Sequence, residues 1–369
     1  MEAFMIDPGV FCSKCGSAYP NEGVPFRCPI CGGLYDYKCA FHFDQTKVDR
    51  TQPGIWRYRH TFGLPPDFEP ISLGEGNTPL IWAKILGRQI AFKCEFLNPS
   101  GSFKDRGSAV ISTWLKGRGV VEAVEDSSGN AGASFAAYGA RAGIKARIFV
   151  PDSASGPKRR QIEAYGAELV PVKGSRSEVA EAVVKEAETG AAYASHAYLP
   201  FNLPGYATAA YEIVEQMEQM PGAVIVPAGQ GGLLLGLARG FKALRIDKEI
   251  TAIPRMIGVQ ARACAPLWAS FIAGGKEPAT VSEDTTLAEG VRVRNLLRRE
   301  AVLAEVLASQ GCICVTEEAE ILPGCAALAR LGFYVEPTSA IVWSALVELL
   351  DELPDPVVVI LTGSGLKYG

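Results

Sequence analysis

Residues 98–107 read Asn-Pro-Ser-Gly-Ser-Phe-Lys-Asp-Arg-Gly, between an apolar run of strand length, Ile90–Phe96, and a helical pattern, Phe103–Gly117. Lys104 is therefore expected in the turn that begins a helix, where the helix dipole disfavours a positive charge and favours the neutral amine. A neutral amine suits covalent chemistry with an aldehyde. The alternative interpretation of Lys104 is an ordinary surface lysine in a turn.

The alternation of strand and helix continues along the chain on both sides of this turn. Apolar runs end in Gly, Ser or Asn and are followed by helical stretches rich in Ala and Leu. This pattern predicts parallel sheets with helices on both faces, arranged as two α/β domains with a cleft at the strand ends. The expected pairs of strand and helix are Val120–Glu125 with Ala131–Gly143, Lys145–Val150 with Pro157–Tyr165, Glu168–Val172 with Ser175–Glu188, and Val224–Pro227 with Gly232–Leu244, and the helix Thr338–Leu350 precedes a last strand, Val357–Leu361.

The composition excludes several classes of function. Hydrophobic residues make up 48% of the 369 residues and charged residues 21%, which is typical of a soluble globular protein. The net charge of −4 gives no overall attraction to nucleic acid or to anionic lipid. The N-terminus has neither a basic nor a long apolar region, so we expect no secretory signal and a cytoplasmic protein with reduced cysteines. The longest uncharged stretch, Gln219–Ala238, contains two prolines and five glycines, so we expect no membrane insertion.

Two Cys-x-x-Cys pairs lie in the first forty residues, Cys12 with Cys15 and Cys28 with Cys31. Four thiolates complete a tetrahedron around zinc and leave no open position, so this spacing predicts a structural zinc ribbon. A ribbon-shaped hairpin without metal is the alternative. The remaining cysteines are expected to pack as small apolar side chains; they are Cys39, Cys94, Cys264, Cys312, Cys314 and Cys325.

A second loop, Asp126-Ser-Ser-Gly-Asn-Ala-Gly132, joins a predicted strand to an Ala-rich helix. Exposed amides at the start of a helix can hold a carboxylate. The side chain of Asn130 offers an amide to a phenolic oxygen. Taken alone the pattern is weak, because Ser-Gly-Asn is common in turns.

A third loop, Gly229-Gln-Gly-Gly232, follows a strand and begins a helix, which makes a cradle of backbone N–H groups for a phosphate. A dinucleotide-binding turn would need an acidic residue at the end of the next strand, and that strand ends in Gln260. A fourth loop begins at Thr362, where a hydroxyl at a strand end can hydrogen-bond a pyridine nitrogen without carrying a charge.

These four loops resemble, in sequence and in order, those of the fold-type II pyridoxal-phosphate enzymes, and among them the threonine synthase form. The resemblance covers nearly the whole chain, since the cysteine pairs also resemble the N-terminal knuckles of many threonine synthases. It implies two three-layer αβα domains with mostly parallel sheets and a small zinc ribbon, with the ribbon at 1–45, a large domain at 46–105 and 212–369, and a small domain at 106–211. Further matching stretches are Gly74–Leu80, Gln161–Ala167, Ile257–Gln260 and Val335–Ala340.

The resemblance also implies roles for single residues. Lys104 would bind the cofactor covalently and act as the base at the substrate's Cα, Phe103 would pack near the cofactor ring, and Thr362 would face its ring nitrogen. The reaction implied is release of phosphate from O-phosphohomoserine with addition of water to give threonine, by a homodimer acting on a small amino acid. The other implied contacts are Asn130 for the cofactor's 3-hydroxyl, Gly229, Gln230, Gly231, Gly232 and Leu233 for its phosphate, and Ser127, Ser128, Asn130, Ala131 and Asn202 for the substrate.

The chain departs from the family's pattern at residues expected to touch the substrate. Asn202 stands where the family has an arginine for the substrate's phosphate, and Ala131 stands where a threonine is common. One interpretation supplies the missing charge from another cation, Lys158, Arg159 or Arg160, although a solvated helix face also explains these three.

The other interpretation is a paralogue that performs β-elimination or β-replacement on a serine-like, threonine-like or O-phosphoserine substrate. His196, near the altered segment, is either a substrate ligand or a structural histidine. A non-catalytic binding module remains a third interpretation, and the intact lysine, asparagine and glycine loops argue against it.

Overall fold

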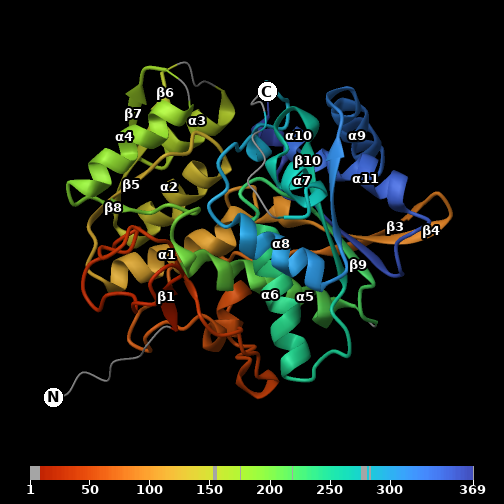
Figure 1. Ribbon diagram of the computed structural model, residues 1–369, viewed down its shortest axis with the longest axis horizontal. Coiled ribbons are helices and arrows are strands. Elements are labelled where there is room, and N and C mark those ends of the chain that lie inside the picture. Colours follow the sequence, from red (N-terminus) through yellow and green to blue (C-terminus); the bar gives the residue numbers. More distant parts are fainter. Residues whose placement is uncertain are drawn as a thin grey trace. The chain divides into compact units, whose positions relative to one another are not determined.

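The computed structural model describes residues 9–152, 156–174, 176–217, 219–275, 281 and 284–368, and Figure 1 shows its helices and strands. The chain divides into two compact units. Unit 1 comprises Met1–Glu75 and Lys104–Gly205, and unit 2 comprises Gly76–Phe103 and Tyr206–Gly369. Each unit is built around its own sheet.

Unit 1 contains a four-stranded parallel sheet in the order β7-β6-β5-β8. From β5 to β7 each strand is added on one side, whereas β8 pairs with β5 on the other side, so the strand order reverses between β5 and β8. Open α/β sheets bind ligands at such a reversal, beyond the carboxyl ends of the strands. The elements are β5 (Glu122–Glu125), α2 (Asn130–Ala142), β6 (Lys145–Pro151), α3 (Pro157–Ala164), β7 (Glu168–Val172), α4 (Arg176–Glu188) and β8 (Ala192–Tyr193), preceded by α1 (Lys104–Gly117) and followed by η4 (Pro200–Asn202).

The N-terminal part of unit 1 is a hairpin of two antiparallel strands, β1 (Val10–Cys12) and β2 (Tyr35–Tyr37). The segment after it contains the 3₁₀ helix η2 (Gly54–Thr61), which packs through buried side chains. Trp56 is buried there and donates its ring N–H to Glu75 at 2.8 Å. Burial of aromatic side chains explains why this stretch folds against the unit.

Unit 2 contains a six-stranded sheet in the order β11-β10-β9-β12-β4-β3, parallel except for the edge strand β3. Here the strand order reverses between β9 and β12, and all four residues of β12 are buried, as expected for a central parallel strand. The strands are β3 (Leu80–Ile85), β4 (Arg88–Lys93), β9 (Ala223–Pro227), β10 (Arg255–Ala261), β11 (Cys312–Thr316) and β12 (Val357–Ile360), and the α-helices are α5 (Leu203–Gln216, which begins in unit 1), α6 (Gly232–Ile246), α7 (Pro266–Ile272), α8 (Arg299–Ala308), α9 (Glu318–Arg330), α10 (Pro337–Ala340) and α11 (Val342–Leu349).

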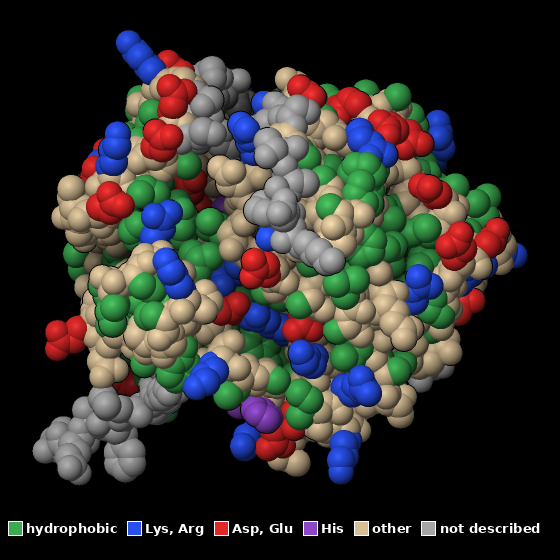
Figure 2. All heavy atoms as spheres, in the orientation of Figure 1, with side chains coloured by type: hydrophobic (Ala, Val, Ile, Leu, Met, Phe, Trp, Pro, Cys, Tyr) green, Lys and Arg blue, Asp and Glu red, His purple; other side chains and the backbone are tan. Residues whose placement is uncertain are grey.

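The two sheets confirm the expected α/β class with mostly parallel strands. Within the described residues, every helix is too short or too polar to cross a bilayer. Basic and acidic side chains are interspersed on the face seen in Figure 2, in keeping with the small net charge.

Candidate functional site

Lys104 and Asn130 are the first residues of α1 and α2 in unit 1. The two helices are joined within their first two turns, because the Ser134 hydroxyl donates to Asp105 Oδ1 at 2.6 Å and lies 2.7 Å from Ser108 Oγ. The starts of both helices therefore lie at the same end of the unit. This arrangement brings the predicted lysine and the predicted asparagine loop to one region.

The loop from Ser127 to Asn130 follows β5 and is held tightly. The hydroxyl of Ser127 accepts from the N–H of Gly129 at 3.2 Å, and Ser127 is buried, as is Ala131. A Cβ on Gly132 would lie 1.8 Å from the carbonyl oxygen of Ser127, so only glycine permits this close turn. Ser128 and Asn130 are partly exposed at the start of the helix, where N–H groups can meet an anion.

In unit 2 the glycine-rich loop lies between β9 and α6, beside the reversal of the strand order. Gly231 adopts a φ of 80° and caps α6, and a Cβ on Gly229 would lie 2.9 Å from the carbonyl oxygen of Gly290. The side chain of Gln230 holds the backbone of Asn295 and Leu297, at 2.9 and 3.1 Å, and Leu233 is buried. The loop thus offers a phosphate its backbone N–H groups rather than side chains.

Thr362 follows β12 on the other side of the same reversal. Its backbone N–H donates to Ser339 Oγ at 2.8 Å and its carbonyl accepts from Phe103 at 3.0 Å. The Thr362 hydroxyl is buried and has no hydrogen-bond partner among the residues that the structure describes. A buried hydroxyl normally has a partner, so this atom fits a ligand that brings one, such as a ring nitrogen. The ring of Phe103 lies 5.3 Å from that of Tyr206.

Gln260, at the end of β10, is fully buried. Its amide donates to the carbonyl of Ala228 at 3.0 Å and accepts from the N–H of Leu267 at 2.8 Å. The strand therefore ends in a structural amide where a dinucleotide site would need a carboxylate for the ribose. Together with the glycine cradle and the buried Thr362 hydroxyl, this chemistry fits pyridoxal 5′-phosphate.

The segment that departs from the family's pattern lies after β8. Asn202 is buried, and its amide donates to the carbonyl of His196 at 2.5 Å. The ring of His196 lies beside Glu125, with 3.0 Å between Nδ1 and Oε1. Among the cations considered as substitutes, Arg159 forms an ion pair with Glu163 on α3, at 3.6 Å. Glu125 was missed in the sequence, because nothing local marks an acidic residue at the end of a strand as part of a site.

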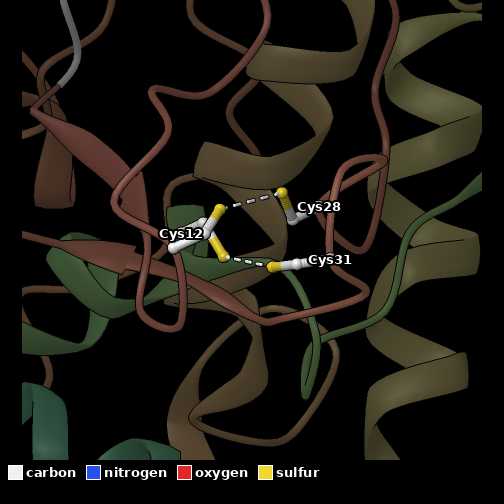
Figure 3. A group of neighbouring side chains, drawn as sticks. Cys12, Cys28 and Cys31 are labelled. Carbon is white, nitrogen blue, oxygen red and sulfur yellow. Dashed lines mark hydrogen bonds between the residues drawn. The ribbon is translucent and has the colours of Figure 1, made fainter.

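The sulfur atoms of Cys12, Cys15, Cys28 and Cys31 all lie within 4.8 Å of one another. Figure 3 shows Cys12, Cys28 and Cys31 turned toward one another, with 3.4 Å between the sulfurs of Cys12 and Cys31 and 3.7 Å between those of Cys15 and Cys28. Four sulfurs about 2.3 Å from one zinc ion are spaced by roughly 3.8 Å, so the cluster fits that ion. A hydrogen bond from Ser17 lowers the pKa of the Cys28 thiol to about 6, which favours the thiolate that a metal needs.

The hairpin formed by β1, β2 and the residues between them carries the four cysteines and is called the cysteine hairpin below. It packs on the segment that carries His196. The ring of Phe26 lies 5.4 Å from Tyr193 and 5.2 Å from Tyr198, and Arg27 donates to the Tyr198 hydroxyl at 2.6 Å. Deeper in the unit, Trp114 on α1 stacks on Phe201 with 4.1 Å between ring centres. The hairpin is thus part of the aromatic core of unit 1.

Comparison with known proteins agrees with this chemistry. Residues 71–363 match the family described as "Pyridoxal-phosphate dependent enzyme". The threonine synthase of Methanocaldococcus jannaschii is 34% identical over 374 residues, covering 96% of this chain and 92% of that protein. The threonine synthase of Methanosarcina acetivorans is 31% identical, with 96% and 91% covered.

Among solved structures, a threonine deaminase from T.th. aligns with a TM-score of 0.69 and 29% identity, covering 79% of this chain and 94% of that one. Threonine deaminase isoform 2 from Solanum lycopersicum has the same fold, with a TM-score of 0.71 and 21% identity over 95% of each chain. The chain therefore belongs to the pyridoxal-phosphate dependent enzyme family, in its fold-type II form, and is homologous to the threonine synthases.

Proposed function

We propose that the chain is a threonine synthase, which converts O-phosphohomoserine and water into threonine and phosphate. The observation that carries the proposal is the identity of 34% to a curated threonine synthase over 96% of this chain. The glycine loop, the asparagine loop and the lysine turn lie at helix starts, as that chemistry requires.

The proposal gives each residue a task. The backbone of Gly229–Gly232 and the Leu233 N–H would hold the phosphate of pyridoxal 5′-phosphate, the Thr362 hydroxyl would hydrogen-bond its ring nitrogen, and Lys104 would offer its amine to the aldehyde carbon. Bound in this way, the cofactor supplies an electron sink for chemistry at the substrate's Cα. The amine of Lys104 removes and returns the proton at Cα, and the N–H groups after Ser127 orient the substrate's carboxylate.

Replacing Lys104 with alanine tests this assignment. We expect Lys104→Ala to lose more than about 10³-fold in turnover, because the base and the covalent anchor are removed together. Lys116→Ala is the matched control, since Lys116 is exposed near the other end of the same helix. Full turnover by the Lys104 variant would overturn the proposal.

A second candidate is elimination or replacement at Cβ of a serine-like or threonine-like amino acid. It is favoured by Asn202, whose neutral side chain is buried and engaged with His196 where the family has a cation for phosphate. Incubation with O-phosphohomoserine, O-phosphoserine, threonine and serine separates the two. Phosphate together with threonine supports the synthase, and keto acid from threonine or serine alone supports the second candidate.

We propose further that Cys12, Cys15, Cys28 and Cys31 hold a structural zinc ion, supported by the closeness of their sulfurs. The prediction of a cytoplasmic homodimer also stands as a proposal, and light scattering of the purified protein would test the dimer. The predicted bounds of the ribbon, 1–45, and of the small domain, 106–211, also stand as proposals. Limited proteolysis would test them.

A further inference from the structure

His196 and Glu125 lie at the point in unit 1 where the strand order reverses. Glu125 is the last residue of β5, and His196 follows β8 by three residues. The two strands are paired, and the chain after β8 stays joined to β5 because Ala194 donates to the carbonyl of Val124 at 2.9 Å. A ligand of an open α/β sheet binds beyond strands arranged like these.

Glu125 connects the predicted carboxylate loop to His196. Its side chain is 1% exposed, one oxygen accepts from the N–H of Ser127 at 2.5 Å, and the other lies 3.0 Å from His196 Nδ1. A carboxylate on Nδ1 fixes both the orientation of the ring and the position of its proton. Nε2, on the other side of the ring, can then accept or donate a hydrogen bond according to its protonation.

The backbone of His196 is held as firmly as its ring. Asn202 donates to its carbonyl, and Asn202 lies on η4, which packs against α1, the helix that begins at Lys104. The Oδ1 atom of Asn202 is buried and lacks a hydrogen-bond partner within the described part of the chain. Asn202 therefore holds the backbone of this turn, while the His196 side chain remains 19% exposed.

A purely structural histidine would not need this arrangement. Burying a carboxylate is costly, and the Asn202 amide already holds the backbone of His196 without a carboxylate beside the ring. A partly exposed imidazole oriented by a buried acid is instead typical of residues that handle a substrate. We propose that His196, oriented by Glu125, contacts the oxygen on the side chain of the amino-acid substrate and thereby sets its specificity.

This inference rests on the proposed function only in taking an amino acid as the substrate. It covers both the ester oxygen of O-phosphohomoserine and the hydroxyl of serine or threonine. His196 is the contacting residue, and Glu125 is a positioning residue that acts through it. Asn202 is assigned to the support of His196 rather than to the substrate.

The test compares ligands with and without a side-chain oxygen in the cofactor-loaded enzyme. Homoserine and threonine carry that oxygen, and 2-aminobutyrate lacks it; binding is read from the change in the cofactor's absorbance. We expect His196→Leu to weaken the binding of homoserine or threonine by about tenfold, which corresponds to the loss of one hydrogen bond. The binding of 2-aminobutyrate should stay unchanged. His196→Gln should recover part of the loss, because its amide can replace Nε2.

Equal weakening of all the ligands, or no weakening at all, would overturn the inference. His42→Leu is the matched control, since His42 is an exposed histidine of the same unit. Glu125→Gln alone should weaken the binding of the ligands that carry the side-chain oxygen. Combined with His196→Leu, it should have little further effect, because both substitutions act on one contact. Binding is measured without turnover, so failure to convert O-phosphohomoserine would refute the synthase alone.

Where His196→Leu does not fold, His196→Phe carries the test, because it keeps an aromatic ring and has no nitrogen to form the hydrogen bond. Loss of selectivity between homoserine and 2-aminobutyrate in that variant supports a substrate contact only if its cofactor absorbance and melting temperature match those of wild type. Unchanged selectivity in a folded His196→Phe variant, together with unchanged selectivity in Glu125→Gln, counts against it.

Discussion

Gly132 shows how a single residue shapes the predicted substrate loop. It lies in the first turn of α2, and any side chain there would meet the carbonyl oxygen of Ser127. The loop can stay close to the helix only because no Cβ intervenes. The sequence shows that residue 132 is a glycine, but only the folded structure shows why a glycine is required there.

We therefore predict that Gly132→Ala costs about 1–3 kcal/mol of unfolding free energy and impairs substrate binding, because the loop must move away from the helix. Gly139→Ala in the same helix is the control, since its nearest neighbour would be 3.4 Å away. That substitution should be neutral or stabilise by up to about 1 kcal/mol. Denaturant unfolding and a ligand titration measure both effects, and equal behaviour of the two variants would contradict this account.

The cysteine hairpin is the element whose role is least visible in the sequence. The pattern predicts a metal knuckle, but not that Phe26 and Arg27 pack on the turn after β8. Those contacts join segments far apart in the chain, and no local pattern encodes them. A metal ion held by the four cysteines would thereby be linked, through the hairpin, to the segment that carries His196.

We predict that Cys28→Ser releases the zinc ion and lowers the melting temperature by several degrees, since a structural zinc ion contributes directly to folding. Homoserine binding should weaken more than cofactor binding, because the hairpin packs on the His196 segment. Cys39→Ser is the matched control, as Cys39 is exposed and outside the cluster. Metal analysis and thermal unfolding provide the readout, and a Cys28 variant that keeps both zinc and stability would refute the prediction.

The regular elements were predicted to different degrees. Parallel strands such as β9 and β12 are uniformly buried, so their apolar runs are visible in the sequence. The edge strand β3 carries exposed Ile81 and Trp82 and was not predicted. The helix expected at Thr338–Leu350 is divided into α10 and α11 at Ile341, a break without a proline or glycine to announce it.

For the molecule as a whole, the sequence predicted the class of fold and the loops at the strand ends. It could not predict which strands would be neighbours. The pairing of β8 with β5 brings Glu125 beside His196, 71 residues later, and that pairing is a property of the complete sheet. This is why the lysine and glycine loops could be named in advance and Glu125 could not.

The stability of the whole molecule should depend on the protonation of His60. Nε2 of His60 accepts from the N–H of Asp44 at 3.3 Å, which requires the neutral ring. Burial lowers the pKa of His60, with Asp44 opposing the shift and Lys47 adding to it. The unfolded chain, in which the histidine has an ordinary pKa of about 6.5, therefore binds the proton more readily than the folded chain. The stability that the neutral His60 contributes is present above that pKa and is lost as the pH falls below it.

We predict that wild type loses more stability than His60→Gln between pH of about 7.5 and about 5.5. The variant has no ring to protonate, and its amide can still accept from Asp44. His42→Gln should follow wild type, because His42 is exposed. Melting temperatures measured across this pH range test the prediction. Equal pH dependence of the melting temperature in wild type and His60→Gln would contradict it.

The packing of the N-terminal hairpin also has a practical side. Trp114, Tyr193 and Phe201 are almost fully buried, and Tyr19 and Phe26 of the hairpin cover part of their surface. A protein shortened to start at residue 46 would turn that aromatic wall toward water, and exposed apolar patches of this kind promote aggregation. A protein from which the hairpin has been removed, for example to aid crystallisation, should therefore be insoluble and unsuitable for activity assays.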